Sequence, residues 1–310
     1  MNAMSYDVLC VGEALITVNR PADQPPPAWG RCWLSVAGAE MNVAIGLARL
    51  GHAVRWATTL GDDPMGDWAL AAARGEGVSV EATRIAQRTG MMVKVARADD
   101  EPSVHYYRDA SAFAIAPPQP DPTSARHLFI SGVTPALSPA CRAAARSVVE
   151  RARTAGSRVC FDINMRRRLW SDSDAIPELR WFCAHADVVF AADDEAALVV
   201  GAGTPAELAR RICELGARQV VVKAGAVALC IGADGAGEAP RCAEVTVRDP
   251  IGAGDAFDAG YLSASLDGLP PSVALARGHR CAAAVCRTIG DWEGFPHRRD
   301  LARQPGSATR

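Results

Sequence analysis

Short apolar runs alternate with helical sequence along most of this chain, and that alternation constrains the fold more than any other feature. Apolar runs of this kind form strands that are buried on both faces, as in a parallel sheet that is covered by helices. The sequence therefore predicts an α/β fold of three layers, α/β/α, around a central and mostly parallel sheet. The clearest runs are YDVLCVG (6–12), RHLFISG (126–132), RVCFDIN (158–164) and QVVVKAG (219–225).

Two segments, approximately 13–37 and 90–112, do not follow the alternation. In the second segment, two β-rich runs flank the polar turn ADDEP (98–102), which is typical of a hairpin. We expect these segments to form a small β-strand lid on the core of a single domain that spans 1–310. The apolar lid run MMVKVA (91–96) is the type of strand that pairs between subunits, so we also expect a homodimer through the lid.

The bulk composition is that of an ordinary globular protein. The chain is 49% hydrophobic with a formal net charge of −2, which excludes the basic footprint of a nucleic-acid-binding protein. Most of the ten cysteines lie in apolar runs and none forms a CxxC pair, so we interpret them as reduced core residues, with a zinc site or disulfides as the alternative. The sequence shows neither a signal peptide nor a run of transmembrane length. We therefore expect a cytoplasmic protein with no nucleic-acid or membrane partner.

The stretch RDPIGAGDAFDAGYL (248–262) places two glycines between a β-like run and a helix-like run. Glycines let the backbone approach an anion, and the first N–H groups of a helix have no intrahelical partner, so such a junction can bind phosphate. The spacing excludes a Walker A loop and a Rossmann fingerprint. The alternative is an ordinary helix start whose first turn carries Asp255, which the helix dipole favours.

Asp255 favours the phosphate-site interpretation. A carboxylate beside an anion site repels phosphate, so its presence there indicates a proton acceptor for an attacking hydroxyl. The backbone N–H groups of Gly252, Ala253 and Gly254 are then expected to form an anion hole for the transferred phosphoryl group. This segment predicts phosphoryl transfer to a hydroxyl group, with Asp255 as the catalytic base.

Two long motifs resemble signatures of one family. DPIGAGDAFDAGY (249–261) is similar to the C-terminal signature of the ribokinase-like (PfkB) carbohydrate kinases. VAGAEMNVAIGLARLG (36–51), followed by LGDDPMGD (60–67), resembles their N-terminal signature. The resemblance implies a ribokinase-like fold, Asp255 as the base, and ATP with Mg²⁺ as cofactors; a monovalent cation, needed in parts of the family, stays open.

Four further stretches resemble the 2-keto-3-deoxygluconate kinases of that family. They are VHYYRDASA (104–112), ISGVTPALSP (130–139), FDINMRRRLW (161–170) and GDWEGFPHR (290–298). The resemblance implies that the residues around the sugar acid are Gly38, Asn42, Tyr106, Arg108, Arg166 and Asp291.

The chemistry of the substrate agrees with this resemblance, although each residue has an alternative role. A sugar acid carries a carboxylate, which the planar fork of arginine binds bidentately, so Arg108 and Arg166 suit it. Arg166 could instead belong to a solvated basic run, and Tyr106 could pack in a lid interface. Asn42 could cap a helix, and Asp291 could be a turn residue.

On the nucleotide side, the resemblance implies that Glu195 organises Mg²⁺ through water. Several positions depart from the family pattern, which puts the nucleotide preference in doubt: Ala192, Ala224, Ala228 and His279 stand where other residues are usual, and Met92 replaces a lid tyrosine. The residues that the resemblance assigns to the nucleotide are Lys223, Gly225, Gly252, Gly254 and His279.

The sequence thus predicts an ATP-dependent kinase that phosphorylates the primary hydroxyl of 2-keto-3-deoxygluconate. A kinase for another sugar, such as fructose or ribose, or for a nucleoside is the alternative within the enzyme class. A non-catalytic protein that binds a sugar or a nucleotide is the alternative outside it, although such a protein has no need of Asp255.

Overall fold

The computed structural model describes residues 5–20, 32–95, 103–225, 227–240 and 245–302. Nine strands form the central sheet: β1 (Tyr6–Val11), β4 (Val54–Gly61), β5 (Ser79–Ile85), β8 (Ala125–Ser131), β9 (Arg158–Asp162), β10 (Val188–Ala192), β11 (Gln219–Ala224), β12 (Val227–Gly232) and β13 (Gly237–Pro240). Their order is β13-β12-β11-β10-β9-β8-β1-β4-β5. Only β12 and β13 run antiparallel to their neighbours, so the predicted, mostly parallel sheet is confirmed.

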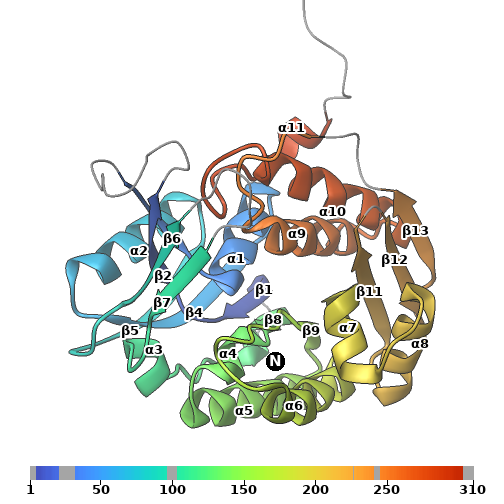
Figure 1. Ribbon diagram of the computed structural model, residues 1–310, viewed down its shortest axis with the longest axis horizontal. Helices are drawn as coiled ribbons and strands as arrows, with labels where there is room; N and C mark the ends of the chain where they lie inside the picture. The colour runs from blue at the N-terminus through green and yellow to red at the C-terminus, as the bar shows by residue number, and fades with distance from the viewer. Residues whose placement is uncertain (1–4, 21–31, 96–102, 226, 241–244, 303–310) are drawn as a thin grey trace, which may run out of the picture.

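Helices cover both faces of this sheet (Figure 1). One face carries α1 (Ala39–Arg49), α2 (Pro64–Gly75), α9 (Ala253–Leu266) and α10 (Pro271–Val285), and the other carries α5 (Pro139–Ala155), α6 (Asp172–His185), α7 (Asp193–Val200) and α8 (Pro205–Leu215). Short helices α3 (Ala112–Ile115), α4 (Val133–Ala136) and α11 (Arg298–Ala302) complete the described part of the chain, together with a 3₁₀ turn at Pro122–Ser124.

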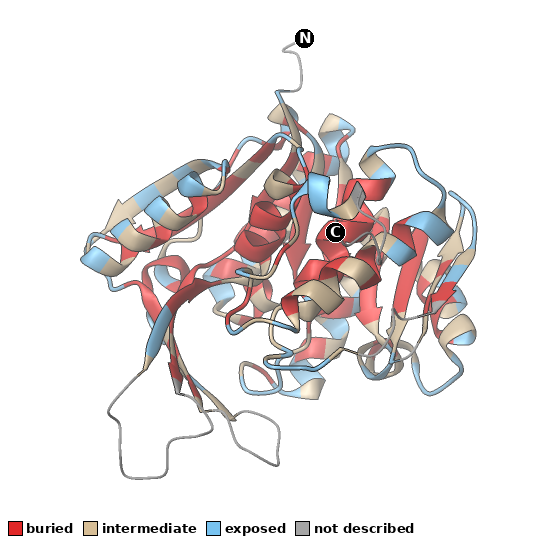
Figure 2. Ribbon diagram, turned by 90° about the horizontal axis from the view of Figure 1, so that it is seen from above, coloured by how far each residue is buried: buried red, intermediate tan, exposed pale blue. Residues whose placement is uncertain are grey.

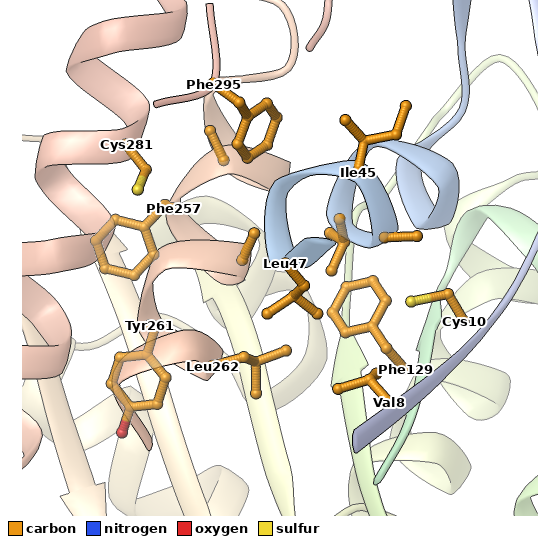
Figure 3. Close-up of a cluster of buried hydrophobic side chains, with 14 of the residues drawn as sticks. Val8, Cys10, Ile45, Leu47, Phe129, Phe257, Tyr261, Leu262, Cys281 and Phe295 are labelled. Carbon is orange, nitrogen blue, oxygen red and sulfur yellow. The ribbon is translucent and has the colours of Figure 1, made fainter. Parts of the chain in front are cut away.

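Each face of the sheet has its own hydrophobic core. In the first core, Leu47 of α1 and Leu262 of α9 pack with Phe129 of the central strand β8 (Figure 3). The second core packs Phe161 of β9 against Phe182 of α6, whose rings stack with centroids 5.0 Å apart. Buried residues follow the sheet through the middle of the molecule (Figure 2), which confirms the three-layer α/β/α prediction.

A second, smaller sheet lies beside the core, and its strands fall within the two segments that the sequence assigns to a lid. They are β2 (Leu15–Arg20), β3 (Trp33–Ala37), β6 (Gly90–Val95) and β7 (Ser103–Tyr107), in the order β3-β2-β6-β7. Strands β6 and β7 pair antiparallel, as the predicted hairpin requires, while β2 and β6 pair parallel. The ADDEP turn itself lies outside the described residues.

The cysteines support the core interpretation wherever the structure describes them. All nine in the described ranges are free thiols, and Cys242 lies outside those ranges. Burial raises the pKa of the Cys160 and Cys183 thiols to about 12, so both stay protonated and unreactive near neutral pH. Within the same ranges, no group of three or more His, Cys, Asp or Glu side chains is arranged to hold a metal ion. No helix there is both long and apolar enough to cross a membrane.

Candidate active site

A cavity of about 940 Å³ opens where the lid strands meet the carboxyl ends of the core strands. Ligands of α/β proteins commonly bind at this edge, especially where the chain order of the strands reverses, as it does between β1 and β8. The structure brings every site residue that the sequence predicts to this one cavity: Gly38, Asn42, Tyr106, Arg108, Arg166, Glu195, Lys223, Gly225, Gly252, Ala253, Gly254, Asp255, His279 and Asp291.

Asp255 lies in the first turn of α9, buried at the wall of the cavity. Asn42 Nδ2, from α1, donates a hydrogen bond of 2.7 Å to Asp255 Oδ2. Burial raises the pKa of Asp255 to about 7, and the nearby Asp162 charge raises it further, whereas Asn42 and Arg166 act in the opposite direction. A carboxyl group with this pKa exchanges a proton readily near neutral pH, which is what a general base requires.

The N-terminus of α9 is built to meet an anion. Its N-cap residue, Gly252, has φ 87°, and no side chain caps the first N–H groups of the helix. A Cβ atom at Gly252 would lie 2.0 Å from the backbone oxygen of Asp291, so only glycine fits between this turn and its neighbour. The uncapped N–H groups and the positive end of the helix dipole favour negative charge at this edge of the cavity.

Lys223 stands close to the same helix terminus and is already paired. Its Nζ lies 3.3 Å from Asp162 Oδ1 and 3.1 Å from Asp258 Oδ1, and both aspartates are buried. Neither aspartate was identified as a site residue from the sequence. Asp162 follows from a general signal, since it ends strand β9 at the edge where ligands bind, but Asp258 lies within a helix and offers no such signal.

Glu195, the predicted organiser of Mg²⁺, is tied to the backbone. Its Oε1 accepts a hydrogen bond from Met165 N at 2.8 Å, and its Oε2 accepts one from Ala192 N at 2.9 Å. Burial raises the pKa of Glu195, followed by the charge of Asp162. With both oxygens engaged, contact with a metal ion through water fits this carboxylate better than direct ligation.

His279 lies in α10 at the far side of the cavity from the lid residues. Its Nε2 is 3.2 Å from the carbonyl oxygen of Ala239, and its ring packs edge-on against Phe257 with centroids 5.1 Å apart. Because a carbonyl oxygen only accepts, Nε2 is assigned as the protonated nitrogen. The imidazole is therefore anchored where the family resemblance places a residue near the adenine.

Arg108 faces a carboxylate of this chain. Its Nε donates to Glu13 Oε2 at 2.8 Å, its Nη2 donates to the same oxygen, and both side chains are buried. Ser111 Oγ donates to the other oxygen of Glu13, and the Arg108 guanidinium lies 5.4 Å from the centroid of the Tyr106 ring. The positive charge of Arg108 is thus compensated within the protein, and a role for it in binding a substrate carboxylate stays a prediction.

The three consecutive arginines 166–168 have different surroundings, although all are exposed and line the cavity. Arg167 pairs with Asp172, as the solvated-run interpretation expects. Arg168 Nη1 donates to the carbonyl oxygen of Val104 in the lid strand β7. Arg166 Nη1 donates only to the carbonyl oxygen of Met165, at 3.2 Å, and forms no ion pair within the described ranges.

Two polar residues that sequence reasoning missed contribute to the site. Asn164, just past β9, has φ 40° and is buried; non-glycine residues with positive φ often occur at functional positions. Its Nδ2 donates to Asp162 Oδ2 at 2.9 Å and lies 3.5 Å from Asp255 Oδ1. Lys94, the single charged residue in the apolar lid run, pairs with Asp291 and lies 3.7 Å from Asp249 Oδ2.

Comparison with known proteins agrees with this site. The model of the pfkB family carbohydrate kinases matches residues 5–298. The chain is 34% identical over 283 residues to a 2-dehydro-3-deoxygluconokinase of Bacillus subtilis (strain 168), covering 86% of this chain and 85% of that protein. It is 30% identical over 296 residues to a 2-dehydro-3-deoxygalactonokinase of Haloferax volcanii, covering 92% of each.

Solved structures share the same architecture. A PfkB protein from Polaromonas sp. JS666 is 36% identical with a TM-score of 0.86, covering 96% of this chain and all of that one. A putative ribokinase II from E. coli, in complex with ATP and Mg²⁺, is 21% identical with a TM-score of 0.87, covering 96% and 98%. The predicted ribokinase-like fold is confirmed. With a family model that spans nearly the whole chain and these relatives beside it, the protein belongs to the pfkB family of carbohydrate kinases.

Proposed function

We propose that this protein transfers the γ-phosphoryl group of ATP to the primary hydroxyl of 2-keto-3-deoxygluconate (2-dehydro-3-deoxygluconate). The observation that carries the proposal is Asp255, a buried carboxyl with a pKa of about 7 at the wall of the cavity, in the first turn of the uncapped helix α9. A proton acceptor beside an anion site serves a hydroxyl that attacks phosphorus.

The charges around the cavity support an acidic acceptor. Lys94, Arg108 and Lys223 each have carboxylate partners, whereas Arg166 forms no ion pair in the described part of the chain and faces the same cavity. An uncompensated guanidinium is suited to a substrate carboxylate, which a neutral sugar lacks. The names of the two curated relatives, kinases for two epimeric sugar acids, point to the same substrate class.

The residues on the nucleotide side fit ATP and Mg²⁺. The α9 terminus offers N–H groups to a phosphate, and a Cβ at Gly252 would close the space that it needs. Lys223, Gly225, Gly254 and His279 would lie along the nucleotide, with Glu195 holding waters of the ion. Bound Mg²⁺ would neutralise charge on the phosphates, as it does in phosphoryl transfer generally.

In this mechanism the acceptor sugar lies between the lid and α1. Asp255 takes the proton of the primary hydroxyl as that oxygen attacks the γ-phosphorus, and Asn42 holds the carboxylate through its 2.7 Å hydrogen bond. The N–H groups of the Gly252–Gly254 turn stabilise the charge that develops on the transferred group. The lid strands exclude water from the reacting atoms, which limits hydrolysis of ATP.

A panel of acceptors with direct measurement of ADP release tests the substrate. We expect turnover of 2-keto-3-deoxygluconate to exceed that of its galactonate epimer, fructose, ribose and nucleosides. Preference for a neutral sugar would contradict the sugar-acid proposal, and ATP binding without any acceptor-dependent ADP release would point to a binding protein. Met92, buried in the lid and unable to donate a hydrogen bond, and the Glu13-compensated Arg108 favour the neutral-sugar alternative over the others.

Two variants test the assigned roles. Asp255→Asn should fold and bind ATP but lose turnover by orders of magnitude, and near-normal turnover would refute the role of Asp255 as base. Arg166→Ala should raise KM for acidic acceptors far more than for neutral ones. Equal effects on both classes would remove the argument that Arg166 binds a carboxylate.

The lid also carries the predicted homodimer interface, which we retain as a proposal. Trp33 and Leu34 of β3 and Tyr107 of β7 are 59%, 53% and 59% exposed. Large apolar side chains gathered on one small sheet are typical of a protein contact. Light scattering during size-exclusion chromatography should report a dimer, and Leu34→Glu should shift it toward the monomer.

A further inference from the structure

Lysine is rare in this chain, and both lysines line the active-site cavity. Only Lys94 and Lys223 occur among the 33 basic residues, the rest being arginine. Each has two aspartates close to its ammonium group. An ammonium group concentrates its charge at one point and carries three donors, which suits a place between several acceptors. Lys223 belongs to the nucleotide half that the family resemblance covers, whereas Lys94 has no role in the mechanism above.

Lys94 connects the lid to the core. It lies on β6, where the buried positions alternate and include Met92 and Lys94, so its side chain points inward from the lid. Its Nζ donates to Asp291 Oδ1, a residue 197 positions later in the chain, and lies 3.7 Å from Asp249 Oδ2. The exposed fractions of these side chains are 4% for Lys94, 6% for Asp291 and 12% for Asp249.

Both aspartates are built into the turn that leads to the anion-binding helix terminus. Asp249 Oδ1 accepts a hydrogen bond from Ile251 N at 3.0 Å, and its Oδ2 accepts one from Gly290 N at 3.3 Å. The backbone oxygen of Asp291 packs against Gly252, where a Cβ would lie 2.0 Å from it. A displacement of either aspartate therefore displaces the start of α9, and Asp255 with it.

The same two aspartates need a counter-charge. Two carboxylates this close together in a nearly dry site repel each other, and removing a partner from a buried ion pair is strongly unfavourable. Burial raises the pKa of Asp291, whereas Lys94 lowers it. In the described part of the chain, Lys94 is the one lysine or arginine that forms an ion pair with either aspartate.

We propose that Lys94 is a positioning residue for the acceptor half of the site: from the lid, its ammonium group holds the Asp249 and Asp291 carboxylates, and through them the turn that carries Gly252 and Asp255. Lid placement and the geometry of the anion-binding turn are then coupled through one side chain. The inference rests on the proposed kinase function only in naming that half of the cavity as the acceptor half.

Kinetics of three variants test this role, with whichever acceptor the wild-type protein phosphorylates best. Lys94→Met keeps the length of the side chain and removes its charge. We expect it to raise KM for the acceptor and to lower kcat, each at least about tenfold, with KM for ATP within about twofold. Lys94→Arg, which keeps the charge, should recover most of both losses. Arg126→Met, which breaks an exposed pair with Asp7, is the control and should match the wild type.

A folded Lys94→Met protein with acceptor KM and kcat within about twofold of the wild type would overturn the inference. So would equal losses in Lys94→Met and Lys94→Arg, since the charge would then not matter. If Lys94→Met does not fold, the double variant Lys94→Met/Asp249→Asn removes the cation together with one carboxylate. Loss of acceptor KM and kcat in that protein would support the inference, and wild-type kinetics would overturn it.

Hydrogen exchange separates this inference from the proposed function, because it needs no turnover. If no acceptor in the panel is phosphorylated, the kinase assignment of the substrate fails, and exchange still reads the coupling. We expect Lys94→Met to exchange faster than the wild type both in β6 and in residues 249–255, and Lys94→Arg to stay close to the wild type. Unchanged exchange at 249–255 in Lys94→Met would overturn the inference.

Discussion

Replacing Asp162 with asparagine tests how this site sets the proton affinity of Asp255. Asn164 Nδ2 is 2.9 Å from Asp162 Oδ2 and 3.5 Å from Asp255 Oδ1, so these two oxygens lie at most about 6 Å apart. After burial, the charge of Asp162 is the main cause that raises the pKa of Asp255. Asp162→Asn preserves the size of the side chain and removes this charge, so the pKa of Asp255 should fall.

The size of the effect follows from the distance. Two unit charges about 6 Å apart interact by roughly 3 kcal/mol at an effective dielectric constant of about 20. If Asn164 and Lys223 screen about half of this, the proton affinity of Asp255 falls about tenfold, since about 1.4 kcal/mol corresponds to a factor of ten. With a wild-type pKa of about 7, about a tenth of Asp255 is ionised at pH 6, and in Asp162→Asn about half should be.

The assay is the pH dependence of ADP release at saturating ATP and acceptor, measured by chromatography from about pH 5.5 to 9, with each variant normalised to its own plateau. Relative turnover at pH 6 should rise from about 0.1 to about 0.5 in Asp162→Asn. Asp258→Asn is the matched control, because it removes the other carboxylate that pairs with Lys223 and leaves Asp162 in place; its profile should move less. A profile that stays unchanged or moves to higher pH in Asp162→Asn would refute the reasoning.

Three further predictions follow from the same contacts. Asp255 has a pKa of about 7 when folded against 3.8 when exposed, so the unfolded chain releases this proton first and stability falls as pH rises between those values. Asp255→Asn should therefore raise the melting temperature more at pH 8 than at pH 5, with a ceiling of about 4 kcal/mol; equal shifts at both pH values would contradict this. Gly252→Ala should lower kcat at least about a hundredfold because its Cβ meets Asp291, whereas Gly77→Ala, with a similar φ of 83° and open space around it, should keep kcat. Glu13→Gln should lower KM for acidic acceptors relative to neutral ones, because it leaves the Arg108 charge uncompensated; a rise in that ratio would show that Arg108 does not meet the acceptor.

The strands and the phosphate site could be predicted because their signals are local. An apolar run such as 219–225 is buried wherever it pairs, so its strand character does not depend on the rest of the chain. The turn before α9 and Asp255 are neighbours in sequence, and their geometry is a property of a few consecutive residues. All of the predicted site residues line one cavity, since the carboxyl ends of parallel strands meet at one edge.

Other parts of the site could not be predicted, because they depend on contacts between distant segments. Glu13 and Arg108 are 95 residues apart, and Lys94 and Asp291 are 197 residues apart. Nothing near Arg108 in the sequence indicates that its charge is compensated, and nothing near Lys94 indicates that it reaches two carboxylates of the core. Asp162 was passed over as part of a strand, although it ends that strand beside the base.

The sequence by itself determined the layered fold, the family signatures and the identity of the probable proton acceptor, because periodicity and short motifs survive in one dimension. Only the tertiary structure decided which charges remain free and how strongly Asp255 holds its proton. Ion pairing and desolvation depend on distance and burial, and packing sets both by bringing together side chains that the sequence keeps far apart.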